Sequence, residues 1–360
     1  MPGKAEQIDH AMDSDRVASL LSGVVDHQLP PVLDELVTEY QSLPDARPEF
    51  VWQWVHKLAP QNTLPCVDAA NRERVLTDKT LIVLFVTLLD DALEKRRDEA
   101  TFQTMASIPF VRRDEERSLN GVHIEDGGVS PPDSVGGDLS GRVDSKYVEF
   151  AQRVWEVLIT RLEQSQRYDR YEDLFRFDLT QAVNAIQYSD LVIRHPEFGT
   201  LEELKRYESH NMGMLAYADV DLMYSSDVPD SLALLRKGVE HGQQMARIGN
   251  WVSTWRRELV EGDYSSGVVV YAVEHNIVTV EELRACASAT EAGVEASVTY
   301  DDLTKRIEEA GVRDTLLEQW NANHQSLQAV DAELSSMDLT PFIEGTEEVF
   351  RYHLASTGLK

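Results

Sequence analysis

The sequence predicts an all-α protein. Apolar residues recur at helical spacing through most of its 360 residues, whereas alternating β-branched patterns are scarce. The stretch that most resembles a strand is the short run GVVVYAV at residues 267–273. Hydrophobic residues make up 42% of the chain, which is enough for a substantial core. We therefore expect one large helical domain over residues 1–360.

The helical patterns follow one another along the chain with clear starts. A Ser–Asp pair opens residues 14–28, and prolines occupy the first turn of residues 30–43. Residues 76–100 are apolar nearly all round before they become charged, which is typical of a buried central helix. Thr200 and Glu203 form a start that resembles a capping box. The other long amphipathic patterns cover residues 144–165, 171–194, 230–262, 300–334 and 341–356.

Two segments lack a helical pattern. Residues 112–143 are rich in Gly, Ser, Pro and charge, so they cannot bury a core. Because helical patterns continue on both sides, we expect a flexible loop insertion rather than a linker between domains. Residues 1–14 are polar and lack the apolar core of a signal peptide, and we expect them to be disordered.

The composition restricts the partners. The net charge of −29 repels nucleic acid and anionic lipid, so neither is an expected partner. The surface, rich in Asp and Glu but poor in Lys, resembles that of a protein from a halophilic host, where salt screens self-repulsion. No apolar run approaches the roughly 20 residues of a membrane span. Cys66 and Cys286 predict neither a disulfide framework nor a CxxC metal site. We expect a soluble, cytoplasmic protein.

A first cluster of carboxylates ends the buried central helix. The stretch LFVTLLDDALEKRRD places Asp90 and Glu94 four residues apart, on one helical face, with Asp91 beside them. Three hard oxygen donors suit Mg²⁺. The alternative is an ordinary acidic helix end, since the chain has 63 acidic residues and adjacent aspartates occur by chance.

A second cluster lies in GNWVSTWRRELVEGD. Asn250, Thr254 and Glu258 follow one another at intervals of four, so on one helix they form a stripe of amide, hydroxyl and carboxylate oxygens. An exposed face is more often charged throughout, and a core face apolar. The stripe therefore predicts ligands for one further Mg²⁺, with a capped polar face as the alternative.

Together, DDxxE and the Asn–Thr–Glu stripe with its Gly262–Asp263 tail resemble the metal motifs of class I terpene synthases of microbial type. The order of the motifs and the separation of 160 residues between Asp90 and Asn250 also fit. The resemblance implies a helical bundle around a central apolar cavity. It also implies three Mg²⁺ ions, two held by the first motif and one by the second, which together bind a prenyl diphosphate.

Further positions match the family in type. The resemblance implies that diphosphate is bound by Arg257, by Arg206 as a candidate sensor, and by the pair Arg351 and Tyr352. Gly213, in SHNMGMLAY, would belong to an interrupted helix that lines the pocket.

One residue departs from the family's pattern, and four aromatic residues carry an open alternative. Trp251 stands where the family usually has an aspartate that is not expected to bind metal. Aromatic faces stabilise carbocations, and Phe85, Tyr217, Trp52 and Tyr224 are candidates, with core packing as the alternative for each.

The resemblance implies a lyase of isoprenoid biosynthesis. It would ionise and cyclise a linear C15 or C20 prenyl diphosphate to a terpene hydrocarbon or alcohol, as a monomer or homodimer. The runner-up is an all-α prenyltransferase that condenses isoprenoid units, although such enzymes usually carry a second aspartate-rich motif. A third hypothesis is a non-catalytic helical protein that binds isoprenoids. The scattered histidines and the absence of GxSxG disfavour zinc, di-iron and serine-hydrolase chemistry.

Overall fold

The computed structural model describes residues 2–110, 143–227, 229–292 and 298–359. Within these ranges the regular structure is helical, apart from an isolated bridge between Val67 and Ser225, so the all-α prediction is confirmed. The strand-like run at 267–273 lies in helix α13. Nearly all of the predicted insertion at 112–143 falls outside the described residues.

The helices follow the predicted order along the chain. Those before the insertion are α1 (Lys4–His10), α2 (Ser14–Val25), α3 (Pro31–Tyr40), α4 (Glu49–Leu58), α5 (Arg72–Asp90) and α6 (Glu99–Ser107). Those from residue 143 to 274 are α8 (Ser145–Leu162), α9 (Tyr168–Arg194), α10 (Leu201–Tyr207), α11 (Met214–Met223), α12 (Leu232–Glu261) and α13 (Gly267–Glu274). The last are α14 (Val280–Ala292), α15 (Tyr300–Glu309), α16 (Val312–Glu333) and α17 (Thr340–Ala355). Short 3₁₀ turns lie at Ala59–Asn62 (η1), Ala69–Asn71 (η2), Ile108–Phe110 (η4) and Glu208–Met212 (η5).

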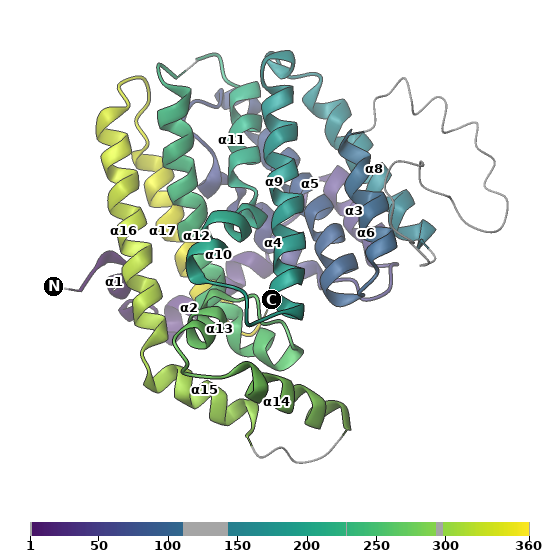
Figure 1. The fold of residues 1–360 in the computed structure, drawn as a ribbon. Coiled ribbons are helices and arrows are strands. Elements are labelled where there is room, and N and C mark those ends of the chain that lie inside the picture. The colour runs from purple at the N-terminus through teal and green to yellow at the C-terminus, as the bar shows by residue number, and fades with distance from the viewer. Residues whose placement is uncertain (1, 111–142, 228, 293–297, 360) are drawn as a thin grey trace.

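Two helices organise the bundle. Helix α5 packs against α4, α8, α9 and α11, and helix α12 packs against α11, α16 and α17. Figure 1 shows α12 beside α16, with α11 between α12 and α9, and with α13, α14 and α15 at the lower end of the molecule. The two helices that carry the predicted metal motifs therefore both belong to the interior of the bundle.

Helix α5 is central, as its sequence predicts. Almost every side chain from Val75 to Leu89 is buried, including the charged Asp78 and Lys79. The helix changes its geometry after Asp90, where residues Asp91–Lys95 form a π-helical turn (η3). Single π turns inside helices occur frequently at functional sites.

The N-terminus differs from its expectation. Where the sequence predicts disorder, helix α1 packs against α16 and α17 with Ala5 and Ile8 buried. The backbone N–H of Ala5 donates to Asn321 Oδ1 at 2.8 Å, and Arg313 pairs with Asp9 at 2.7 Å. These partners lie more than 300 positions away in the chain, so local composition does not indicate them.

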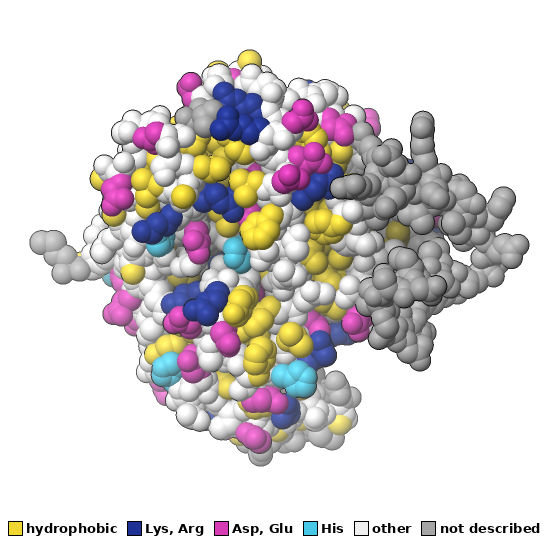
Figure 2. Space-filling model, turned by 45° about the horizontal axis from the view of Figure 1, so that its top comes forward, with side chains coloured by type: hydrophobic (Ala, Val, Ile, Leu, Met, Phe, Trp, Pro, Cys, Tyr) yellow, Lys and Arg dark blue, Asp and Glu magenta, His cyan; other side chains and the backbone are white. Residues whose placement is uncertain are grey.

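The visible surface carries both signs of charge. On the face in Figure 2, basic and acidic side chains are interspersed with hydrophobic ones, so the negative charge of the chain does not form a single area there. Among the helices of the described ranges, none combines the length and apolarity that crossing a bilayer requires.

A buried histidine pair joins α2 and its following turn to α4. His27 Nε2 lies 2.7 Å from His56 Nδ1, and His56 is 4% exposed. Burial, with a smaller contribution from His27, lowers the pKa of His56 to about 4. Because this folded-state pKa lies below the unfolded value, the unfolded chain binds more protons between about pH 4 and 6.5. Stability from this site is therefore complete above that window and is lost as the pH falls through it.

We expect wild-type protein to lose about 2 kcal/mol more unfolding free energy between pH 7 and pH 5 than His56→Asn loses. Urea unfolding of both proteins at pH 7 and pH 5 and at constant ionic strength measures this difference. Groups that titrate alike in the two proteins contribute equally to both changes in unfolding free energy and cancel. Parallel pH curves for the two proteins would contradict the role given to His56.

Candidate active site

The first motif lies where α5 passes into the π turn. Asp90 is the last residue of α5, and Asp91 and Glu94 belong to the turn. Asp90 and Glu94 lie close to each other, and Asp263 from the other motif lies near them. Burial and these two negative charges raise the pKa of Glu94 well above its usual range. Such crowding of carboxylates favours a proton or a cation between them.

Asp91 has a different environment from Asp90. It is 2% exposed and accepts hydrogen bonds from Arg47 Nε at 2.9 Å and from the Tyr40 hydroxyl at 3.0 Å. Lys95 lies 3.1 Å from the same carboxylate. Arg47 also reaches Asp90, with Nη2 2.5 Å from Oδ2. The segment between α3 and α4 is thus attached to the first motif through one guanidinium.

The second motif lies along α12, as predicted. The Thr254 hydroxyl donates to the backbone oxygen of Asn250 at 2.8 Å, and the Asn250 side-chain oxygen accepts from Arg247 Nη1 at 2.7 Å. Burial and the charge of Asp263 raise the pKa of Glu258 to about 7, although Arg247 opposes this shift. Arg257 Nη2 also lies 3.6 Å from Glu258 Oε1.

The tail of the second motif turns back toward the first. Gly262 ends α12 with a φ of 80°, a left-handed conformation that glycine adopts without strain. Asp263 follows, and its Oδ1 accepts from the Ser265 backbone and hydroxyl at 2.9 and 2.7 Å. Burial raises the pKa of Asp263, and the charge of Asp90 adds to the shift. The glycine turn thus brings a further carboxylate to the site.

Arg247 lies between the two motifs. Burial lowers the pKa of its guanidinium, and negative charges from both motifs act on it and oppose this shift: Glu258, Glu94, Asp263 and Asp90. Its Nε donates to Glu208 Oε2 at 2.7 Å, and Nη2 pairs with the other oxygen of Glu208. The structure therefore brings the two motifs together around one cation. Arg247, Glu208 and Arg47 lie outside both motifs, so the motif patterns do not indicate them.

The side chains of the site have the donor atoms that a divalent cation needs, but in this conformation they are not arranged around one point. The site offers carboxylate, amide and hydroxyl oxygens, which are the donors that Mg²⁺ prefers, and its like-charged carboxylates are crowded together. Yet across the described part of the chain no three His, Cys, Asp or Glu residues surround one point closely enough to hold a metal. Arg47 and Arg247 instead occupy oxygens of Asp90, Asp91 and Asn250.

The predicted diphosphate-binding residues lie at several places. Arg206 is 61% exposed and pairs with Glu202 at 3.4 Å on α10. Arg257 directly precedes Glu258 of the second motif on α12, and it lies 3.6 Å from Glu258 and 2.6 Å from Glu261. Arg351 on α17 lies 3.0 Å from Glu348. Tyr352 is buried in a small cluster with Leu20, Val24, Leu58 and Ala355. Each carries a role that remains a prediction.

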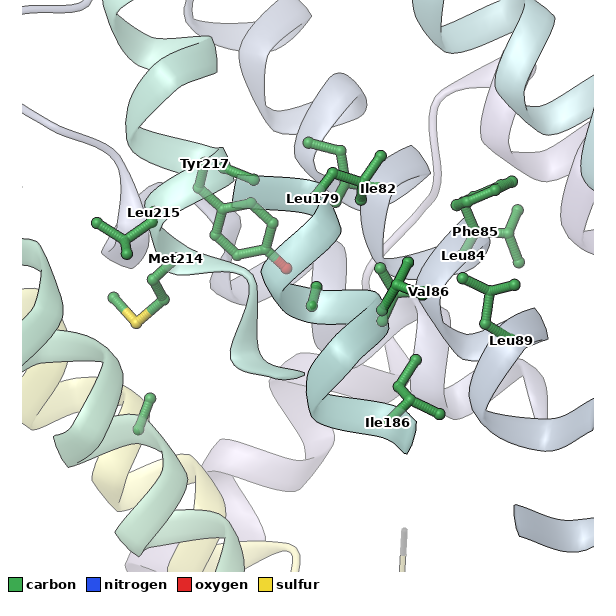
Figure 3. Packing of buried hydrophobic residues seen from close by; sticks show 14 of the residues in the cluster. Ile82, Leu84, Phe85, Val86, Leu89, Leu179, Ile186, Met214, Leu215 and Tyr217 are labelled. Carbon is green, nitrogen blue, oxygen red and sulfur yellow. The ribbon is translucent and has the colours of Figure 1, made fainter. Parts of the chain in front are cut away.

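The predicted pocket residues belong to the interior. Phe85 on α5 is buried against Trp155, with ring centroids 5.4 Å apart. Gly213 links η5 to α11 with a φ of 64°, so the helix is interrupted at the predicted place. Figure 3 shows Tyr217 projecting from α11, near Leu179 on α9, with its hydroxyl directed toward α9. Burial raises the pKa of this phenol above its usual range.

Comparison with known proteins supports the fold. No protein-family model matches the sequence, and no curated protein matches it. A polyprenyl synthetase from Streptomyces coelicolor A3(2) has a similar structure, with a TM-score of 0.53, 15% identity, and coverage of 95% of this chain and 96% of that one.

A second similar structure is 2-methylisoborneol synthase from the same organism, solved in complex with Mg²⁺ and geranyl-S-thiolodiphosphate. It gives a TM-score of 0.50 and 12% identity, and covers 97% of this chain and 92% of that one. The chain therefore has the all-α fold that these two enzymes share. At these identities the likeness establishes the fold, and the chemistry must be argued from the site.

Proposed function

We propose that this protein is a Mg²⁺-dependent class I terpene cyclase. It would ionise a linear C15 or C20 prenyl diphosphate, cyclise the resulting cation and release diphosphate. The observation that carries the proposal is the meeting of the two motifs, because the charges of Asp90 and Glu94 act on the same Arg247 guanidinium as those of Glu258 and Asp263. The two motifs are 160 residues apart in the sequence, and the helical fold alone does not require them to meet at one buried, charged centre. Their meeting therefore supports a shared function.

Three Mg²⁺ ions are part of the proposal. Asp90, Asp91 and Glu94 would hold two of them, and Asn250, Thr254 and Glu258 would hold the third. Bound ions supply positive charge that stabilises the negative charge of the departing diphosphate.

The chain's own residues bind and orient the substrate. The allylic C–O bond breaks heterolytically, and its electron pair leaves with the diphosphate oxygen. Arg257, Arg206 and Arg351, with the Tyr352 hydroxyl, would donate hydrogen bonds to that group. The remaining organic cation lies in the apolar interior, where the ring faces of Phe85 and Tyr217 would stabilise it. Loss of a proton or capture of water ends the reaction.

Condensation of isoprenoid units is the second candidate. It is favoured by the similarity to a polyprenyl synthetase, and it uses the same first ionisation. The Asn–Thr–Glu stripe favours cyclisation, because chain-elongating enzymes usually carry a second aspartate-rich motif in its place.

The test is an assay of the purified chain with C10, C15 and C20 prenyl diphosphates, with and without Mg²⁺, at low and high salt. We expect Mg²⁺-dependent release of diphosphate, and gas chromatography should detect a hydrocarbon or alcohol. If addition of isopentenyl diphosphate yields longer prenyl diphosphates, the protein is a prenyltransferase rather than a cyclase. Release from none of the substrates would reject both, and binding without turnover would favour a non-catalytic protein.

A further inference from the structure

A buried ion pair lies beside the proposed metal motifs without belonging to either. Glu208 in η5 is fully buried and Arg247 on α12 is 12% exposed. Arg247 Nε donates to Glu208 Oε2 at 2.7 Å, and Ser189 from α9 donates to Oε1 at 3.4 Å. The pair therefore links the interrupted segment before Gly213 to the helix that carries the second motif.

Pairing with Glu208 does not use all the capacity of Arg247. A guanidinium has five N–H donors in a planar fork, and the bonds to Glu208 and Asn250 use three of them. The same guanidinium lies within electrostatic range of the carboxylates Glu258, Glu94, Asp263 and Asp90. A group with unused donors at the junction of both motifs is placed to contact whatever binds between them.

The other candidate arginines are placed differently. Arg206 lies on the outer side of α10, with 61% of its side chain exposed. Arg257 and Arg351 are 35% and 25% exposed, and each pairs with glutamates on its own helix. Arg257 contacts Glu258 of the second motif, but among these four arginines Arg247 is the one that also contacts the interrupted segment, through Glu208.

We propose that Arg247 binds the diphosphate group of the substrate, and that Glu208 is the positioning residue that holds its guanidinium in place. This inference rests on the proposed function, since it concerns the substrate of the same site. Planar bidentate recognition of phosphate oxygens is what the arginine fork does best. Because Glu208 fixes the guanidinium before the substrate arrives, little side-chain freedom is lost on binding.

Calorimetric titration of the full-length chain with inorganic diphosphate in saturating Mg²⁺ tests this assignment. The main variant is the double substitution Arg247→Gln/Glu208→Gln, which avoids leaving either partner as an unpaired buried charge. We expect its diphosphate affinity to fall about 10- to 100-fold, with a ligand-free unfolding midpoint close to that of wild type. Arg256→Gln removes an exposed arginine from the same helix and is the matched control. Its affinity should equal that of wild type.

Each outcome decides the assignment. A double variant that binds diphosphate within about twofold of wild type overturns the role of Arg247, while the proposed function stands. Glu208→Gln alone should weaken binding by a smaller factor, and an unchanged affinity overturns its positioning role. A wild-type chain that binds no diphosphate with Mg²⁺ overturns both the inference and the proposed function.

Discussion

Asp90→Asn is expected to lower the rate of diphosphate release by at least about 100-fold, since it removes one negative charge from the centre of the site. Asn250→Ala is expected to have an effect of similar size from the opposite side, because it removes the oxygen that faces Arg247 at 2.7 Å. The two substitutions lie on different helices, so a shared local defect in folding does not explain a shared loss. Steady-state release of diphosphate from the best prenyl substrate measures both.

The matched control for Asp90→Asn is Glu156→Gln. Glu156 is an exposed acidic residue on α8, the neighbour of α5, so its substitution removes one negative charge without touching the site. Activity of this variant should equal that of wild type. Turnover near the wild-type rate in both Asp90→Asn and Asn250→Ala would reject the metal-site model. Circular dichroism of each variant separates loss of activity from loss of fold.

Much of the fold follows from local pattern. The apolar run before Asp90 predicts a buried central helix, and 14 of the 19 residues of α5 are buried. The stripe of Asn250, Thr254 and Glu258 predicts a helix, because its spacing is meaningful only there. The predicted pattern at 300–334 breaks into α15 and α16 at Gly311, which has a φ of 67°. A glycine inside a helical pattern is a signal for such an end.

The environment of the site does not follow from local pattern. Arg47 is 44 positions from Asp91, and Glu208 is 39 positions from Arg247. No periodicity links such pairs, since they form only when the bundle brings the segments together. Within the π turn at Asp91–Lys95, Asp91 is held by Arg47, whereas Glu94 lies near Asp263 and Arg247. The sequence indicates which side-chain oxygens are candidate Mg²⁺ ligands, but it does not indicate that Arg47 and Arg247 already contact some of them.

A buried ion pair between α5 and α11 carries the second large effect. Lys79 on α5 and Asp221 on α11 are 1% and 0% exposed, and Nζ lies 2.7 Å from Oδ1. Lys79 also donates to the backbone oxygen of Asn62 at 2.8 Å and to Thr63 Oγ1 at 3.1 Å. Asp221 accepts from the backbone N–H of Leu64 at 2.8 Å. One pair therefore joins α5, α11 and the segment after η1.

Lys79→Met is expected to lower the free energy of unfolding by about 3–5 kcal/mol, since it leaves Asp221 as an unpaired buried carboxylate. Burial already raises the pKa of Asp221 to about 6 in the presence of Lys79. Loss of the lysine raises this pKa further, because the positive charge that favours the ionised carboxylate is removed. Asp221→Leu should have a loss of similar size, because it leaves a buried ammonium group.

The double variant Lys79→Met/Asp221→Leu is expected to be more stable than the sum of the single losses predicts, by at least about 2 kcal/mol. Recovery should be partial, because the backbone groups of Asn62 and Leu64 lose their partners in the double variant. The exposed pair Arg256–Glu308 provides the control cycle, in which the coupling should stay below about 1 kcal/mol. Urea unfolding at constant salt measures both cycles. Additive losses at Lys79 and Asp221 would mean that the two charges are stabilised separately by their backbone partners, and that the pair does not join α5 to α11.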